Sequence, residues 1–185
     1  MYKLLIGLLI LCSASFAAAD EKYDFIMCNQ EYALCTSAKC IPDPRSPEKN
    51  ALCNCQVFTG KSLGMTSCDK RKVKKINSGV KSLTSTFSYV QVPPKQMMQC
   101  PNGAVWTNCL DQPCIVDPTN PQQAICSCLI VTSGESVTYG GGCNTSTCHK
   151  AFWSAAAPTI DYAKAARQLG NNSSIYQNSL CKKPQ

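Results

Sequence analysis

The chain has 185 residues, fifteen of them cysteine and only one of them histidine, and a formal net charge of +7. No stretch beyond its first residues has the roughly 20 apolar residues that a membrane span needs, so we expect a protein that does not span a membrane. The mild positive charge comes without an excess of arginine, which gives no indication of a specific nucleic-acid partner.

The chain begins with features of a secretory signal. Lys3 precedes an apolar run at 4–11, and Ala17-Ala18-Ala19 forms a small-residue cleavage site. This order is typical of a cleaved signal peptide over residues 1–19. We therefore expect a mature chain that starts at Asp20 and is secreted or periplasmic.

Removal of the signal, which contains Cys12, leaves fourteen cysteines. An even and dense cysteine set in an exported chain predicts a disulfide framework of up to seven bridges. Its members are Cys28, Cys35, Cys40, Cys53, Cys55, Cys68, Cys100, Cys109, Cys114, Cys126, Cys128, Cys143, Cys148 and Cys181.

One stretch occurs twice, at 40–55 and at 114–128. Both copies read Cys-Ile-x-Asp-Pro-x-x-Pro, followed by Ala, a branched apolar residue and Cys-x-Cys. Such self-similarity predicts two tandem homologous modules. We divide the chain into a first module at 20–68, a connecting segment at 69–99, a second module at 100–143 and a tail at 144–185.

Each repeat predicts a turn and then a strand. The Asp-Pro-x-x-Pro motif favours a fixed turn, because proline presets φ and the aspartate can accept hydrogen bonds from backbone N–H groups just ahead. Residues 51–58 and 124–131 favour strands, with a reversal expected after each at Gly60 and Gly134. In the second module the chain should return as a hairpin through 136–139.

In these strands the two cysteines of each Cys-x-Cys point to one face. Their Cα atoms would lie about 6.5–7 Å apart, at or beyond the usual limit for a disulfide. Cys53 and Cys55 should therefore bond to different partners, as should Cys126 and Cys128.

The connecting segment carries a run of cations and a second apolar alternation. The cations form a possible anion-binding patch for a polyanion or anionic lipid headgroups, although a solvated loop is the simpler reading. They are Lys70, Arg71, Lys72, Lys74 and Lys75. The alternation at 87–92 suggests a strand.

The tail contains the best helix pattern of the chain, over 158–170. Thr159 can cap its first turn and Gly170 can close it. Cys148 and Cys181 flank this segment and have no counterpart in the first module. We predict that they pair and hold the helix against the second module.

Candidate chemistries are few. Gly60-Lys61-Ser62-Leu63-Gly64 matches the hydrolase pattern Gly-x-Ser-x-Gly, but the chain lacks the strand–helix alternation which that motif needs. His149 directly follows Cys148, and adjacent residues rarely place a base so that it faces a free thiolate. We therefore expect no enzyme and no cofactor.

Three further readings stay open. The Cys-x-Cys pairs could bind Zn²⁺ or Cu⁺ as thiolates, although the framework reading leaves no metal site. The stretch from Asp111 to Pro121 could serve as the braced loop of a protease inhibitor. The cysteine spacing of 28–68 and 100–143 resembles that of EGF-like modules, but the glycine–aromatic pattern of that family and its acidic calcium signature are missing.

The sequence thus predicts a small disulfide-rich fold of short β-strands and loops, in two tandem modules with one C-terminal helix. Its expected function is that of an exported, non-enzymatic binding or structural protein. The partner would be an unknown protein or surface ligand.

Overall fold

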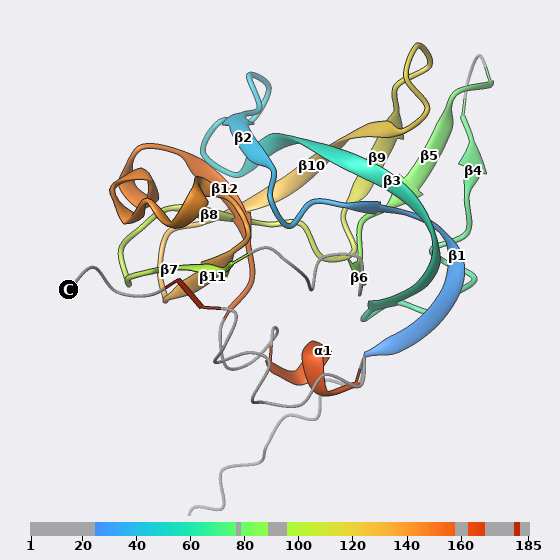
Figure 1. The fold of residues 1–185 in the computed structure, drawn as a ribbon. Helices are drawn as coiled ribbons and strands as arrows, with labels where there is room; N and C mark the ends of the chain where they lie inside the picture. Colours follow the sequence, from blue (N-terminus) through green and yellow to red (C-terminus); the bar gives the residue numbers. More distant parts are fainter. Residues whose placement is uncertain (1–24, 77–78, 89–95, 158–162, 169–179, 182–185) are drawn as a thin grey trace, which may run out of the picture.

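The computed structural model describes residues 25–76, 79–88, 96–157, 163–168 and 180–181 (Figure 1). The expected signal peptide lies outside them. The described chain is mostly strand and is disulfide-rich, which confirms this part of the predicted fold class. The strands are β1 Ile26–Leu34, β2 Lys39–Pro42, β3 Asn50–Gly64, β4 Lys74–Lys75, β5 Lys81–Thr84, β6 Phe87–Ser88, β7 Met98–Cys100, β8 Trp106–Asn108, β9 Pro113–Val116, β10 Gln123–Val131, β11 Ser136–Thr138 and β12 Phe152–Ala155.

Five strands close into a ring. β3 pairs with β2 and β10, β2 with β12, β12 with β8, and β8 with β10. All of these pairings are antiparallel except β12 with β8. β1 and β6 extend β3, whereas β9, β5 and β4 continue outward from β10. The result is a small barrel in which each member strand is paired on both sides, which removes free edges.

The two strands predicted after the Asp-Pro-x-x-Pro turns, at 51–58 and 124–131, correspond to β3 and β10. These strands lie side by side and antiparallel, with Cys53 directly opposite Cys126. Across the neighbouring strands, Cys40 lies opposite Cys53 and Cys114 opposite Cys126. A row of four buried cysteines therefore crosses β2, β3, β10 and β9.

Alanines flank this row. Ala51 lies opposite Cys128, and Ala124 lies opposite Cys55. All four side chains are fully or almost fully buried. Because a disulfide occupies more space than two methyl groups, the small alanines leave room for the sulfur atoms of the facing strand.

The seven disulfides are Cys28–Cys68, Cys35–Cys55, Cys40–Cys53, Cys100–Cys148, Cys109–Cys128, Cys114–Cys126 and Cys143–Cys181. Each Cys-x-Cys neighbour has a separate partner, as the strand geometry predicts. The predicted bond between Cys148 and Cys181 is wrong. Cys148 bonds to Cys100 because the 3₁₀ helix η4, Thr145–His149, packs against β7.

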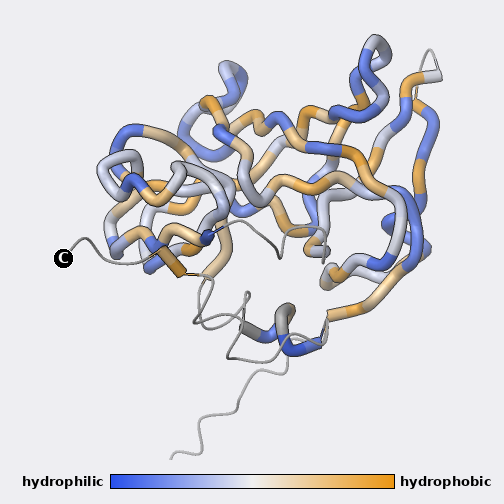
Figure 2. Tube along the Cα trace, in the orientation of Figure 1, coloured by the Kyte–Doolittle hydropathy of each residue, from blue (hydrophilic) through white to orange (hydrophobic). Residues whose placement is uncertain are grey.

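Both Asp-Pro-x-x-Pro motifs form the expected turns, at 43–49 and 117–122. The Asp43 carboxylate accepts a hydrogen bond from the backbone N–H of Arg45. The Asp117 carboxylate accepts hydrogen bonds from the N–H and hydroxyl groups of Thr119. The two hairpin loops project on the same side of the molecule in Figure 1, and their tips are hydrophilic in Figure 2.

The strand reversals differ from expectation. Gly60 lies inside β3, opposite Gln30 of β1, so the chain does not turn there. Gly134 does adopt a positive φ of 80° at a turn. The following strand β11 pairs with β7 in a separate two-stranded sheet, however, and does not form a hairpin with β10. The reason is that β8 and β9 already occupy the free side of β10.

The connecting segment and the tail complete the fold. The strand expected at 87–92 is described only at β6, and residues 89–92 lie outside the described residues. Of the expected helix, the structure describes α1 Ala163–Gln168, whereas Thr159 and Gly170 lie outside. In the described part of the chain, no helix is long and apolar enough to span a membrane.

Candidate functional site

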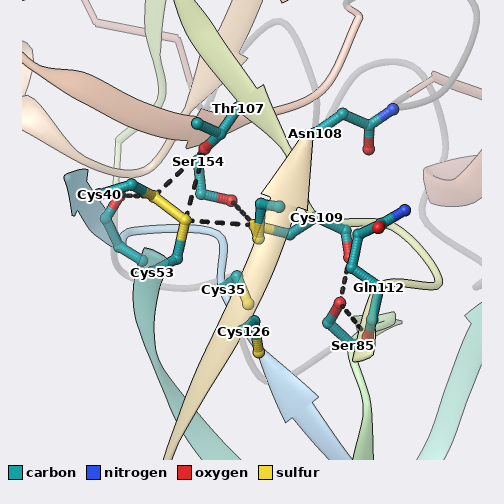
Figure 3. Close-up of a disulfide and its surroundings, with 12 residues drawn as sticks. Cys35, Cys40, Cys53, Ser85, Thr107, Asn108, Cys109, Gln112, Cys126 and Ser154 are labelled. Atoms are coloured by element: carbon teal, nitrogen blue, oxygen red, sulfur yellow. Dashed lines mark hydrogen bonds between the residues drawn. A yellow bond between two sulfur atoms is a disulfide. The ribbon is translucent and has the colours of Figure 1, made fainter. Parts of the chain in front are cut away.

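The barrel interior is filled with disulfides and hydroxyl groups (Figure 3). The Thr107 hydroxyl lies 3.2 Å from the Cys40 sulfur and 3.6 Å from the Cys53 sulfur. The Ser154 hydroxyl lies 3.3 Å from the Cys109 sulfur. Thr107 and Ser154 are buried on β8 and β12, so a polar contact to sulfur satisfies each hydroxyl inside the core.

The sulfur atoms are close enough to resemble a metal site. Those of Cys35, Cys55 and Cys126 lie within 4.8 Å of one another, as do those of Cys35, Cys109 and Cys128. All five cysteines are in disulfides. Zn²⁺ and Cu⁺ bind thiolates, so this arrangement could hold a metal only after reduction.

The opposite face of the central strands, which we call the outer face, carries exposed aliphatic side chains beside the polar Asn54, Gln56 and Ser127. Alternation along β3 and β10 buries the cysteines and turns Leu52 and Ile125 outward. Neighbouring strands add Ile41 and Ile115, and Leu129 continues the pattern on β10. Ile41 is 61% exposed, Ile115 42%, Ile125 44% and Leu129 46%.

Strand registers place these side chains next to one another. Ile125 lies directly opposite Ile115, and Leu52 lies opposite Ile41. The row through Ile115 continues to Lys74 by way of Ser82. Across the β3–β10 pair, Leu52 lies opposite Ser127 and Ile125 lies opposite Asn54. The apolar side chains therefore form two pairs, Ile41–Leu52 and Ile125–Ile115, that are diagonal neighbours, and the row beyond Ile115 ends at a cation.

A groove with a volume of about 430 Å³ adjoins the outer face. We call it the amide groove, because four of its six lining residues carry side-chain amides. These residues are Gln56, Val57 and Phe58 of β3 and Asn120, Gln122 and Gln123 from the loop and start of β10.

The loop beside this groove is held firmly at several points. The Gln122 carbonyl accepts a hydrogen bond of 2.9 Å from the backbone N–H of Val57. The backbone N–H of Gln123 donates to the Asn120 carbonyl at 2.9 Å. The Cys114–Cys126 disulfide joins the two strands just behind the loop. These contacts set the shape of the groove before any ligand binds.

The hairpin aspartates have perturbed acidities. Hydrogen bonds from Arg45 hold the pKa of Asp43 below its ordinary value. Hydrogen bonds from the hydroxyl and backbone N–H of Thr119 lower the pKa of Asp117. Both turns therefore favour the ionised carboxylate.

The expected anion-binding patch is only partly a surface feature. Lys70, Lys72, Lys74 and Lys75 are exposed, and Lys72 forms an ion pair of 2.5 Å with Asp69. Arg71, in contrast, is 1% exposed, so its assignment to a solvent-facing patch is wrong.

The Arg71 side chain instead points into the protein beneath β1. It donates hydrogen bonds to the Ile26 carbonyl at 2.6 Å and to the Cys28 sulfur at 2.5 Å. Burial lowers the pKa of Arg71, against an opposing effect of the nearby Asp111. Asp111 in turn accepts a hydrogen bond of 2.6 Å from the backbone N–H of Met65, so these two charges tie the first and second cysteine segments together.

The residues of the weaker motifs do not come together. Ser62 is fully buried inside β3, and its neighbour across the sheet is Cys28 of a disulfide. His149 is exposed, and the adjacent Cys148 is bonded to Cys100. Neither arrangement presents a nucleophile next to a base.

The outer face and the amide groove were missed by the reasoning from sequence. The alternation of the Cys-x-Cys strands was interpreted only for the buried cysteines. The same alternation places Leu52, Gln56, Ile125 and Leu129 on the other side of the strands. This sequence pattern could have predicted the outer face. The contribution of Ile41 and Ile115 depends on strand order, which the sequence does not reveal.

Comparisons of the chain with protein-family models, with curated proteins and with solved structures each found no match. The similarity in cysteine spacing to EGF-like modules is thus not accompanied by a family match.

Proposed function

We propose that this protein is an exported, non-enzymatic binding protein built from two tandem modules, and that its outer face contacts the partner. The observation that carries the proposal is the group of exposed aliphatic side chains that neighbouring strands place on one face of a disulfide-bonded sheet. Exposed apolar patches of this kind are typical of interaction sites, because water contact with them is unfavourable.

The disulfides support this role through rigidity. Four bridges cross-link the strands whose other side forms the outer face: Cys35–Cys55, Cys40–Cys53, Cys109–Cys128 and Cys114–Cys126. A surface that is already ordered loses little conformational entropy when a partner binds. The two braced hairpin loops, at 43–49 and 117–122, can add polar contacts at the rim.

Export is the part of the proposal that mass spectrometry tests. Seven disulfides favour an oxidising compartment, and the signal should be cleaved near Ala19. We expect exported protein to start at Asp20 and to gain fourteen hydrogen atoms on reduction. Several free thiols before reduction would contradict the framework.

Photo-crosslinking tests the binding surface. A photoreactive amino acid at Ile125 should capture a defined partner from the protein's own extracellular or periplasmic surroundings. The matched control is the same probe at Met65, which has nearly the same exposure, 43% against 44%, but lies outside the outer face. Equal capture at both positions, or at neither, would count against the outer face.

Protease inhibition is a second candidate. The loop at 117–122 is exposed and braced by the Cys114–Cys126 disulfide, as an inhibitory loop requires. The earlier part of the expected loop does not qualify, because Asp111 is held by Met65 and Thr66. Incubation with serine, cysteine, aspartic and metalloproteases decides this candidate, and uniform lack of inhibition removes it.

Metal binding is a third candidate, favoured only by the sulfur spacing in the barrel. Elemental analysis of protein purified without reductant should find less than one metal ion per chain. A stoichiometric metal, together with free thiols, would replace the disulfide interpretation by a thiolate site.

A further inference from the structure

The amide groove has a composition that differs from that of the aliphatic outer face beside it. Its lining holds four side-chain amides, one valine and the half-buried ring of Phe58. None of the six lining residues carries a charge. A ligand of this groove must therefore satisfy amides and an aromatic ring without an ionic contact.

Two of the amides are oriented by hydrogen bonds within the protein. The Gln123 side-chain oxygen accepts a hydrogen bond of 3.4 Å from the Asn54 amide. The Asn120 side-chain oxygen accepts one of 3.3 Å from the backbone N–H of Gln122. Each contact uses one lone pair of an amide oxygen, so both residues can still donate through the NH₂ group and accept through the oxygen. The exposed side chains of Gln56 and Gln122 add amides that can both donate and accept.

The aromatic component is also fixed in place. Phe58 lies opposite Tyr32 in the β1–β3 pair, and their rings stack with centroids 6.2 Å apart. The Tyr32 hydroxyl is in turn hydrogen-bonded to Ser88. Phe58 thus lines the groove as a supported ring and not as a mobile side chain.

We propose that the amide groove binds a neutral oligosaccharide. This inference rests on the proposed binding function and names a ligand class for the groove beside the outer face. Sugar hydroxyl groups both donate and accept hydrogen bonds, as amides do, and the C–H face of a pyranose ring is apolar enough to contact Phe58. The groove volume is within the range of about 300–1,000 Å³ that is usual for small-molecule sites.

The other ligand chemistries fit less well. A phosphate, sulfate or carboxylate binds most strongly where a cation or a helix N-terminus meets its charge, and the lining residues carry no charge and come from strands and a loop. A purely apolar ligand would remove four amides from water without replacing their hydrogen bonds, which is unfavourable. A neutral polyhydroxylated ligand avoids both costs.

Binding is tested with the oxidised full-length mature protein by saturation-transfer NMR and calorimetry. Acidic glycans are measured for comparison beside a panel of neutral gluco-, manno- and chito-oligosaccharides. We expect at least one neutral oligosaccharide to bind. Gln122→Ala and Gln56→Ala should each weaken that binding by about threefold to tenfold, which is the usual contribution of one hydrogen bond to affinity. Gln99→Ala is the matched control, since Gln99 is an exposed glutamine on β7. It should leave the affinity unchanged, and thermal melts should show that all variants fold.

Each result has a defined meaning. The sugar assignment is overturned if no oligosaccharide binds at millimolar concentration, or if Gln99→Ala weakens binding as much as the groove variants. It is also overturned if only acidic glycans bind and substitution of Lys74 and Lys75 abolishes their binding. A partner captured at Ile125 without any sugar binding would remove this inference and leave the proposed function intact. Failure of both experiments would remove both.

Discussion

The two cysteine segments, 28–68 and 100–148, share one arrangement at their centres. Cys35–Cys55 corresponds to Cys109–Cys128, and Cys40–Cys53 corresponds to Cys114–Cys126. The strand registers correspond as well. Leu34 lies opposite Gln56 in the first segment, and Asn108 occupies the same position opposite Leu129 in the second.

The segments differ outside these centres. β3 has 15 residues and pairs along its second half with the nine-residue β1, whereas β10 has nine residues and pairs with the three-residue β8. Cys68 closes the first segment, but the corresponding bridge to Cys100 comes from Cys148 and not from Cys143. The repeated string therefore determines the two central bridges of each segment, which we call the central clamp, whereas the flanking residues determine strand length and outer connections.

The largest expected effect comes from removing the central bridges. Cys40→Ala/Cys53→Ala and Cys114→Ala/Cys126→Ala should each lower the free energy of unfolding by about 3 kcal/mol. The two losses should be alike, because the bridges have sequence separations of 13 and 12 and all four cysteines are buried. Chemical denaturation curves measure them. A large loss in one segment and none in the other would show that the two clamps are not equivalent.

These central clamps are also where prediction from sequence worked best. The spacing of Cys53 and Cys55 on one strand was enough to assign them separate partners, because strand geometry is local. The pairing of Cys148 was not predictable, since it depends on how η4 packs against β7. The role of Arg71 was missed for a similar reason. Its neighbours in sequence are exposed lysines, and only tertiary contacts with Ile26, Cys28 and Asp111 reveal its burial.

The next largest effect is expected from substitutions that enlarge the side chains packed against the bridges. Ala51→Leu and Ala124→Leu should each destabilise the protein by about 2 kcal/mol, because the added atoms meet Cys128 and Cys55 in a close-packed core. Serine at the same positions adds one atom and serves as a control for size. If leucine were tolerated at Ala51 but not at Ala124, the packing of the two segments would differ although their bridges match.

A smaller effect is expected at the glycines that follow the clamps. Gly134 has a φ of 80° and open space where a Cβ would stand. Gly134→Ala should therefore cost about 1 kcal/mol from backbone conformation alone. Gly60, with a φ of 144°, also has open space, but it lies within the β1–β3 pair. Gly60→Ala should in addition speed hydrogen exchange in β1, and equal exchange in both variants would contradict this difference.

The smallest effect concerns the hairpin aspartates, whose lowered pKa values have different causes. A carboxyl group with a lowered pKa in the folded protein stabilises it above the unfolded pKa of about 3.9, and this contribution is lost as the pH falls through the folded value. Unfolding measured from pH 5 down to pH 2 should therefore show less acid sensitivity in Asp43→Asn and in Asp117→Asn than in the unchanged protein.

Salt then distinguishes the two aspartates. The Asp43 pKa is lowered most by the hydrogen bonds from the charged side chain of Arg45, which is 80% exposed. Because salt screens exposed charges, 1 M NaCl should weaken the contribution of Asp43 to the acid sensitivity. The Asp117 pKa is lowered by hydrogen bonds from the uncharged Thr119, so the contribution of Asp117 to the acid sensitivity should persist in 1 M NaCl. If salt reduced both parts equally, a general charge effect would explain the acid sensitivity of the two turns better than these local hydrogen bonds.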